Sequence, residues 1–303
     1  MTPRWAIVVL SWNGRGDTLA CLGSAREIAR EDVRVICVDN GSDDGSAEAV
    51  RHEFPEVELI ENGRNLGFAG GNNVGIRRAL ELGADWVVLL NNDATLAADA
   101  IDGLERVASR RSNAGILGGK VLFAERPNQI WFAGQRFNAR LGYSGRPRGY
   151  ARPDGKRYDQ VIPVERTLGT LMAVSREAIE AVGLLDEELF AYVEDVEWCL
   201  RTRATGYEVL FVPGARAWHR VSASGGGDSV STHPLYYGAR NTIVVCERHA
   251  PLGRAGTLLR RLAVAVTFGL RAVTRRNRRE ALRAVRAGVR DALAGRLGMR
   301  PSG

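Results

Sequence analysis

Two apolar segments of this chain end abruptly in polar side chains, and they constrain its fold more than any other feature. Residues 86–90 read Trp-Val-Val-Leu-Leu and lead into an Asn-Asn-Asp sequence that ends at Asp93, whereas residues 33–38 lead into the turn-rich segment 39–46. A short continuous apolar run is typical of a strand buried on both faces of a parallel sheet. Open α/β sheets bind ligands at the carboxyl ends of such strands. Two acidic strand ends at one edge therefore predict a site for a nucleotide and a divalent metal.

The rest of the pattern predicts an α/β fold. Strands are predicted over residues 6–11, 33–39, 57–61, 86–91, 115–122 and 209–212. Helices are predicted over residues 17–30, 46–53, 71–82, 98–110, 175–182, 193–205 and 234–249. Alternating strands and helices with short connections favour a mostly parallel sheet covered on both faces. Residues 124–160 are rich in Gly, Pro and Arg and predict irregular hairpins and loops.

Charge is distributed unevenly along the 303 residues. The chain has a net charge of +7, but residues 251–303 hold 13 Arg and two acids, which gives +11 there and −4 for residues 1–250. Two apolar stripes at helical spacing lie in this basic segment: Leu259, Ala263, Val266, Leu270 and Val273, then Leu282, Val285, Val289 and Leu293. Arg279, Arg283, Arg286 and Arg290 fall on a different face of the second helix.

Two basic amphipathic helices beside an acidic body suggest docking on an anionic membrane surface. The alternative is a helical pair folded onto the body with a solvated basic face. Nucleic acid is not an expected partner, because no recognised nucleic-acid-binding module accompanies the charge. We expect no signal peptide and no membrane span, since the longest late apolar run is nine residues and a span needs about 20. The four cysteines are far apart in sequence, which predicts core thiols in a reducing compartment.

Six motifs then occur in an order that resembles one enzyme family. They are IVVLSWNG (7–14), VDNGSDDGS (38–46), NLGFAGGNNVGI (65–76), LLNNDATL (89–96), the segment GTLMAVSREAIEAVGLLDEELFAYVEDVEWCLR (169–201) and RAWHRVSASGG around His219. The chain resembles the inverting glycosyltransferases of family two, which have the GT-A (Rossmann-like) fold, near their rhamnosyltransferase-like members. The resemblance covers residues 5–248 and implies a glycosyltransferase domain over 1–250, with a donor-binding half (1–123) and an acceptor and catalytic half (124–250), followed by the basic helical tail (251–303).

The resemblance implies a donor site for a nucleotide sugar. Asp39 would accept a hydrogen bond from the imide N–H of a uracil or thymine base, although an Asx turn at a strand end would also explain an aspartate there. The other donor-binding residues implied are Ser11, Asn13, Asn40, Gly41, Ser42, Asn65, Gly71, Asn72, Asn92 and Asp93. Residues 67–73 could face an anion with free backbone N–H groups, or could simply form a tight glycine turn.

The resemblance also implies a Mg²⁺ or Mn²⁺ cofactor bound at the end of the fourth strand. Asp93 would be the metal ligand, in an Asn-Asn-Asp variant of the family's DXD motif that retains a single acid; the alternative is a helix cap. His219 would complete the metal or diphosphate contacts, although a lone histidine is more often a surface or core residue. The glycines at 225–227 suit a lid over bound donor.

Asp195 is the catalytic residue that the resemblance implies. Inverting transfer to a hydroxyl needs one general base on the acceptor side, and the family's base is the aspartate after a glutamate. Glu194 would orient the acceptor or stabilise the start of the local helix, and Arg201 and Arg240 match further family positions, where either could be structural. Trp198 could stack on a sugar face of the acceptor, although a buried tryptophan is the more ordinary alternative. The alternative is an acidic first helical turn that only stabilises the helix through its dipole.

The sequence thus predicts transfer of a sugar, rhamnose or another deoxyhexose, from a dTDP- or UDP-sugar to a lipid-linked saccharide in cell-envelope polysaccharide synthesis. The expected location is cytoplasmic, peripheral on the inner membrane face. A soluble natural-product glycosyltransferase and a catalytically silent nucleotide-sugar-binding protein are the alternatives.

Overall fold

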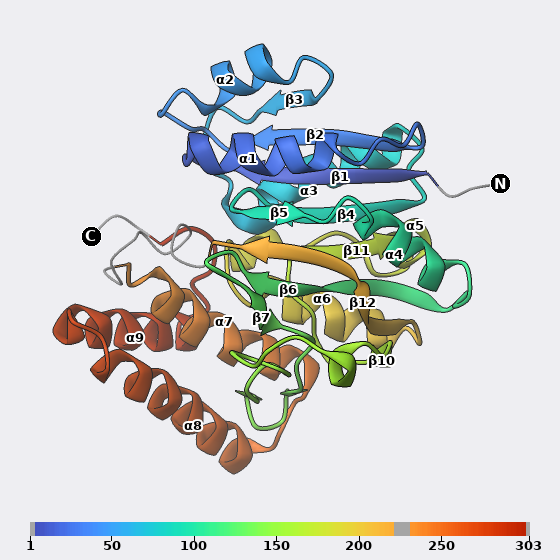
Figure 1. Cartoon of the computed structure of the whole chain (residues 1–303). Helices are drawn as coiled ribbons and strands as arrows, with labels where there is room; N and C mark the ends of the chain where they lie inside the picture. Colours follow the sequence, from blue (N-terminus) through green and yellow to red (C-terminus); the bar gives the residue numbers. More distant parts are fainter. Residues whose placement is uncertain (1–3, 221–230, 301–303) are drawn as a thin grey trace.

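A computed structural model describes residues 4–220 and 231–300 of the chain (Figure 1). Among these residues, ten strands form one sheet in the order β10-β12-β6-β11-β4-β1-β2-β3, with β5 paired to β12 and β7 to β6. The strands are β1 (Trp5–Ser11), β2 (Val33–Asp39), β3 (Glu58–Glu61), β4 (Trp86–Asn91), β5 (Ala94–Leu96), β6 (Ala114–Phe123), β7 (Arg126–Phe132), β10 (Ile162–Pro163), β11 (Leu171–Ser175) and β12 (Glu208–His219). A separate short pair joins β8 (Phe137–Asn138) to β9 (Tyr143–Ser144).

The sheet is mostly parallel, as the sequence predicts. The β1–β2, β1–β4, β2–β3 and β6–β12 pairs are all parallel. The central strand β11 runs antiparallel between β4 and β6. It is not predicted by the sequence pattern, because a five-residue run is too short to show a period. The predicted α/β class is confirmed. For most of the predicted helices and strands, the observed first and last residues differ from the predicted ones by a few positions.

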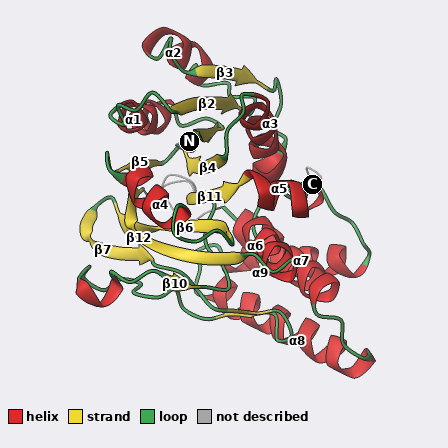
Figure 2. Cartoon of the chain, turned by 90° about the vertical axis from the view of Figure 1, so that its right-hand side faces the viewer, coloured by secondary structure: helices red, strands yellow, loops and turns green. Residues whose placement is uncertain are grey.

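Helices cover both faces of the sheet (Figure 2). They are α1 (Arg15–Arg26), α2 (Ser46–Glu53), α3 (Gly67–Glu81), α4 (Ala100–Ala108), α5 (Arg176–Val182), α6 (Glu194–Ala204), α7 (His233–His249), α8 (Arg254–Val273) and α9 (Arg278–Leu293), with short 3₁₀ turns η1 (Lys156–Tyr158) and η2 (Glu187–Leu189).

Alternating side chains of the buried strands pack into two separate cores. Ile7 and Val9 of β1 pack in one core with residues of α1 and α4, whereas Val8 packs in the other with residues of α3, α5 and α6. Both faces of β1 and β4 are therefore apolar, which explains why their sequences read as continuous hydrophobic runs.

Helix α3 lies unusually close to β1. A Cβ atom added at Gly75 would lie 2.3 Å from Cγ1 of Val8, and one added at Gly71 would lie 2.4 Å from Cδ1 of Leu10. Two glycines four residues apart thus form one smooth helix face. This close approach brings the first turn of α3 to the end of β1.

The C-terminal helices pack against α7. Leu235 and Ala239 of α7 share a core cluster with Ala281 and Val285 of α9. The Tyr236 hydroxyl contacts Oδ2 of Asp291 at 2.7 Å. The tail is therefore folded onto the body: α8 and α9 pack against each other, both contact α7, and α8 is the outermost of the three helices (Figure 1). In the part of the chain that the structure describes, every helix is too short or too polar to cross a bilayer.

Adding a methyl group at the glycine contact between α3 and β1 should destabilise the fold. In Gly75→Ala the new methyl group meets a stiff β-branched valine, so we expect a loss of about 1–3 kcal/mol in the free energy of unfolding. Gly23→Ala in α1 is the matched control: its Cβ would meet nothing within 4 Å, so helix propensity should raise stability by up to about 1 kcal/mol. Urea unfolding of both variants checks this, and equal effects would contradict the close packing.

Candidate active site

Three neighbouring parallel strands end at the same edge of the sheet. Ser11 at the end of β1 lies opposite Asp39 at the end of β2, and Leu10 lies opposite Asn91 at the end of β4. The register thus brings together the two polar strand ends that the sequence predicts at one edge. This edge is where an open α/β sheet binds ligands.

Asp39 is buried and has one carboxylate oxygen occupied. Its Oδ2 accepts hydrogen bonds from the backbone N–H groups of Gly41 (3.1 Å) and Ser42 (3.0 Å). Its Oδ1 is buried without a hydrogen-bond partner among the described residues. The Asx turn therefore exists, and it leaves one oxygen able to accept an N–H from a bound base. Gly41 has φ +79°, and a Cβ there would lie 2.7 Å from the backbone of Arg64, so this turn requires glycine.

Asn13, Ser42 and Asn92 join the loops around this edge. The Ser42 hydroxyl accepts from the Asn13 N–H at 2.9 Å, and Asn13 Oδ1 accepts from the Asp43 N–H at 3.0 Å. Asn92 Nδ2 donates to the Asn13 carbonyl at 3.2 Å and to the Thr18 hydroxyl at 3.0 Å. The Thr18 hydroxyl also contacts that of Ser11 at 2.9 Å. These polar groups shape the wall of the site through contacts with one another.

Asn40 and Asn65 hold the start of α3 against β2. Asn40 Nδ2 donates to Asn65 Oδ1 (3.0 Å) and to the Gly67 carbonyl (3.1 Å), while its Oδ1 accepts from Asn62 and from the Leu66 N–H. Every polar atom of the Asn40 side chain is engaged in this way. Asn40 therefore fixes the loop, and its side chain has little capacity left for a ligand.

Gly71 and Asn72 lie inside α3, which begins at Gly67 and not after residue 70 as the sequence suggests. Gly71 packs on Leu10 of β1, and Asn72 is buried with its Nδ2 donating to the Phe68 carbonyl at 2.9 Å. The expectation that residues 67–73 form a loop is therefore wrong. The glycine-rich run is explained by close helix–strand packing.

Asp93, in the turn between β4 and β5, is a neighbour of His219 at the end of β12. His219 at the end of β12 pairs in register with Ala94 of β5, and its Nε2 lies 2.8 Å from Oδ1 of Asp93. Both side chains are buried, and the His219 ring packs against Trp131 with centroids 4.6 Å apart. The two residues predicted as metal ligands, 126 positions apart in sequence, are thus in contact.

The donor set suits a divalent ion shared with a ligand. One carboxylate and one imidazole can each supply one ligand atom, and phosphate oxygens commonly complete the shell of Mg²⁺ or Mn²⁺. Among the described residues no group of three or more His, Cys, Asp or Glu side chains could hold a metal alone. The residues present therefore fit an ion that binds together with a diphosphate.

Glu194 and Asp195 begin α6 and are both buried. Asp195 Oδ2 accepts from Arg166 Nη2 at 3.2 Å, and its Oδ1 accepts from the Val196 N–H at 2.7 Å. Burial, and then the neighbouring charge of Asp195, raise the pKa of Glu194 to about 8. Glu194 therefore holds a proton at neutral pH, and Asp195 is the carboxylate of the pair that has a cationic partner.

An aromatic pocket of about 510 Å³ lies between the end of β1, the start of α3, the loop before α6 and the start of α7. Its lining combines Asn13 and Asn65 with Trp12, Phe68, Phe190, Tyr192, His233 and Tyr237. Phe190 and Tyr237 are stacked with ring centroids 5.4 Å apart. Burial, and then the nearby charges of Glu194 and Asp93, raise the pKa of Tyr192 to about 12. Tyr192 is therefore close enough to Asp93 and to Glu194 for both charges to affect its pKa. Flat rings of this kind suit a base or a sugar face.

The backbone that leads to Glu194 is strained. Phe190, Tyr192 and Val193 all have positive φ, at 64°, 64° and 75°. A left-handed conformation costs a non-glycine residue about 1–2 kcal/mol. Such strain persists only where surrounding contacts enforce it.

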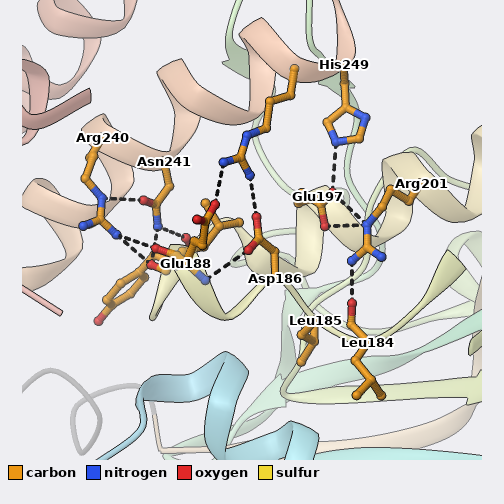
Figure 3. Close-up of polar contacts among 12 residues, drawn as sticks. Leu184, Leu185, Asp186, Glu188, Glu197, Arg201, Arg240, Asn241 and His249 are labelled. Atoms are coloured by element: carbon orange, nitrogen blue, oxygen red, sulfur yellow. Dashed lines mark hydrogen bonds and ion pairs between the residues drawn. The ribbon is translucent and has the colours of Figure 1, made fainter. Parts of the chain in front are cut away.

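Helix α7 supplies those contacts (Figure 3). Asn241 Nδ2 donates to the carbonyls of Leu189 (2.9 Å), Ala191 (2.9 Å) and Tyr192 (2.7 Å). Arg240 donates to the Leu189 carbonyl at 2.9 Å and orients the Asn241 amide through its Oδ1 at 2.8 Å. We call these two residues with the carbonyls of 189–192 the α7 clamp.

Three residues expected near the acceptor have internal roles instead. Trp198 is fully buried in the core, and its Nε1 donates to the Gly183 carbonyl at 2.9 Å. Arg201 donates to Glu197 at 2.8 Å and to the carbonyls of Val182 and Leu184. Arg240 is buried in the α7 clamp. For Trp198 the expectation of acceptor contact is wrong, because no surface of it is exposed.

Sequence reasoning misses Arg166 and the aromatic lining. Arg166 lies 29 positions before Asp195, in a segment with no regular pattern. Tyr192 and Tyr237 come from two different elements, which the α7 clamp joins. The lid expected at 225–227 lies outside the described residues.

Solved structures share this architecture. The mannosyltransferase PcManGT from Pyrobaculum calidifontis, solved with GDP-Man and Mn²⁺, is 19% identical and superimposes with a TM-score of 0.59 over 97% of this chain and 76% of its own. GalNAc-T7, solved with UDP, GalNAc and Mn²⁺, is 16% identical, with a TM-score of 0.57 over 72% of this chain and 44% of its own. The sheet with its acidic strand ends is the GT-A fold of nucleotide-sugar glycosyltransferases.

Sequence comparison gives the family. Residues 3–231 match glycosyltransferase-like family 2, and the chain belongs to this family. An N-acetylglucosaminyl-diphospho-decaprenol L-rhamnosyltransferase of Mycobacterium tuberculosis (strain CDC 1551 / Oshkosh) is 32% identical over 94% of this chain and 99% of its own length. A dTDP-rhamnosyl transferase of Shigella flexneri is 27% identical over 81% of both chains. The chain is thus a glycosyltransferase.

The raised pKa of Glu194 predicts a pH-dependent stability. The folded chain keeps a proton with a pKa of about 8, whereas the ordinary value is 4.5. The stabilisation is therefore complete below the lower value and is lost as pH rises through the higher one. Between pH 4.5 and pH 8 the free energy of unfolding of the wild type should therefore fall. In Glu194→Gln, which has no proton to lose, this fall should be smaller by about 1 kcal/mol or more. Urea unfolding at both ends of the range measures it, with exposed Glu180→Gln as control; parallel profiles would refute the buried proton.

Proposed function

We propose that this glycosyltransferase works with inversion and depends on a divalent metal. The donor is a dTDP- or UDP-linked sugar, a deoxyhexose such as rhamnose, and the acceptor is a hydroxyl of a lipid-linked saccharide used in cell-envelope polysaccharide synthesis. The observation that carries this proposal is the buried Oδ1 of Asp39, which lacks a partner among the described residues. Two rhamnosyltransferases among the relatives support the choice of donor.

The acceptor places the enzyme at a membrane. We assign it to the inner face of the cell membrane as a peripheral protein, with residues 251–303 facing the anionic surface. The name of the M. tuberculosis relative includes a diphospho-decaprenol acceptor, which supports a lipid-linked substrate. The charge of +11 in residues 251–303 favours anionic lipid over other surfaces.

The named side chains have separate roles in this proposal. Asp39 accepts the imide N–H of the base, and the aromatic pocket takes the base and sugar. Asp93 and His219 would hold the Mg²⁺ or Mn²⁺, which would supply positive charge to a departing diphosphate. Asp195 takes the proton from the acceptor hydroxyl as that oxygen attacks the anomeric carbon. Arg166 orients Asp195, and protonated Glu194 can donate a hydrogen bond without adding a second negative charge.

Donor binding is the first test. We expect UDP and dTDP, but neither ADP nor GDP, to bind in calorimetry, and only with Mn²⁺ or Mg²⁺ present. In Asp93→Ala the metal should no longer strengthen UDP binding, because the ion loses its one carboxylate ligand. Metal-dependent binding retained by this variant would move the ion elsewhere. Failure of every nucleotide to bind would overturn the donor assignment.

Asp195→Asn tests the base. A positioned general base contributes roughly 10²–10⁴-fold to rate, so transfer should fall by that factor while calorimetric UDP binding stays unchanged. Asp102→Asn, on the surface of α4, is the matched control and should keep full activity. Loss of UDP binding in Asp195→Asn would make the residue part of the donor site instead.

A further inference from the structure

The outer face of α8 is an exposed apolar row. Its members have from 50% to 67% of their surface exposed: Leu258, Leu259, Leu262, Val266, Leu270 and Val273. Apart from the adjacent pair Leu258 and Leu259, successive members are three or four residues apart, which places them along one side of the helix. Helix α8 is the outermost element of the chain in this region (Figure 1). Scattered exposed leucines are ordinary, but a contiguous row of this length marks an interaction surface.

The row continues into an apolar groove between α8 and α9. The groove has a volume of about 540 Å³, and Ala265 and Gly269 line it on the α8 side. Leu282, Val289 and Leu293 line it on the α9 side, and Arg286 and Arg290 complete the lining. Apolar walls with two guanidinium groups suit a hydrocarbon chain that ends in a phosphate.

Arginines border this surface on α9. Arg279, Arg283, Arg286 and Arg290 are exposed and follow one another at helical spacing. No acidic side chain of the described residues forms an ion pair with Arg279, Arg283 or Arg286. Their charge is therefore available to a partner.

Charge decides what covers the row. Helix α8 contains four arginines and no acid, and residues 251–303 carry +11. A second copy of the chain would bring the same charge against itself, which disfavours dimerisation through this face. An anionic lipid surface instead offers phosphates to the arginines and acyl chains to the leucines.

We propose that α8 and the α8–α9 groove form the membrane-docking surface, which inserts into the interface of an anionic phospholipid bilayer. The α8 row and the groove contact acyl chains, and the α9 arginines contact lipid phosphates. This inference rests on the proposed function and deepens it by assigning the docking surface to specific side chains.

Docking through this surface would fix the active site relative to the bilayer. Helix α9 packs on α7 through Ala281 and Val285, and a Cβ at Gly288 would lie 2.3 Å from the Tyr236 carbonyl. The first turns of the same α7 supply His233 and Tyr237 to the aromatic pocket. One rigid helix thus separates the lipid surface from the site that receives a lipid-linked acceptor.

Vesicle sedimentation tests the proposal with the full-length protein. The vesicles are phosphatidylcholine alone, or phosphatidylcholine with phosphatidylglycerol. The triple variant Leu262→Glu, Val266→Glu, Leu270→Glu changes only exposed side chains, so it should fold. We expect its affinity for anionic vesicles to fall at least 100-fold, since burial of each leucine or valine contributes about tenfold or more. Leu82→Glu, at the end of α3, is the control and should bind as the wild type does.

A second variant isolates the charge. In Arg279→Gln, Arg283→Gln, Arg286→Gln we expect about a fivefold loss on anionic vesicles for each arginine, and little change on phosphatidylcholine alone. Wild-type binding by the triple α8 variant, or equal binding to both vesicle types, would overturn the proposal. So would a wild-type dimer in sedimentation velocity that the α8 variant converts to monomer.

Two further measurements, calorimetric UDP binding and sugar transfer to a water-soluble acceptor, test the proposed donor site separately from the proposed docking surface. Both should be unchanged in the α8 variant, because no substituted side chain lines the aromatic pocket. Normal UDP binding with no vesicle binding by the wild type would refute the docking surface alone. Vesicle binding without UDP binding would refute the proposed donor alone.

Discussion

The α7 clamp is the interaction on which the active site depends. Three residues before the catalytic pair have left-handed backbone conformations, which together cost about 3–6 kcal/mol. Asn241 and Arg240 offset this through hydrogen bonds to buried carbonyls, each worth about 1 kcal/mol net and more when a charged donor takes part. The contact between the Ala69 N–H and the Phe190 carbonyl adds a second support from α3. Without these hydrogen bonds, the backbone strain would favour a different loop conformation, and Glu194 and Asp195 would no longer be directed inward.

Two buried carboxyl groups, those of Glu194 and Asp195, are adjacent at the start of α6. Desolvation opposes charge on both, and mutual repulsion opposes two charges more strongly. Two features reduce this repulsion. Arg166 forms an ion pair with Asp195, and Glu194, whose pKa is raised to about 8, keeps its proton. The pair therefore carries one negative charge next to one positive charge. A carboxyl group must be deprotonated to act as a general base toward a hydroxyl, and in this pair only Asp195 has a cationic partner.

Sequence predicts most of the sheet, because long apolar runs such as 86–90 identify buried strands without tertiary information. It also predicts that Asp39 and Asp93 share one edge, since both follow parallel strands. It fails where the deciding contact is distant: α3 begins at Gly67, and Gly71 and Gly75 are required by the close approach of Leu10 and Val8 of β1. Trp198 resembles a sugar platform in sequence and is core in the fold. Arg166 shows no local signal, because its role depends on a residue 29 positions away.

The tail unites the two alternatives that sequence leaves open. The buried face of α9 packs on α7, so the helices are folded onto the body, yet the α8 row remains exposed. If the α8 row packed against another part of this chain, its side chains would be buried rather than exposed to water. Removing the whole tail would uncover Leu235 and Ala239 of α7 and loosen the α7 clamp as well. The proposed docking surface and the proposed catalytic loop are therefore supported by the same helix, and substitutions confined to the outer face of α8 are the way to test membrane contact separately from catalysis.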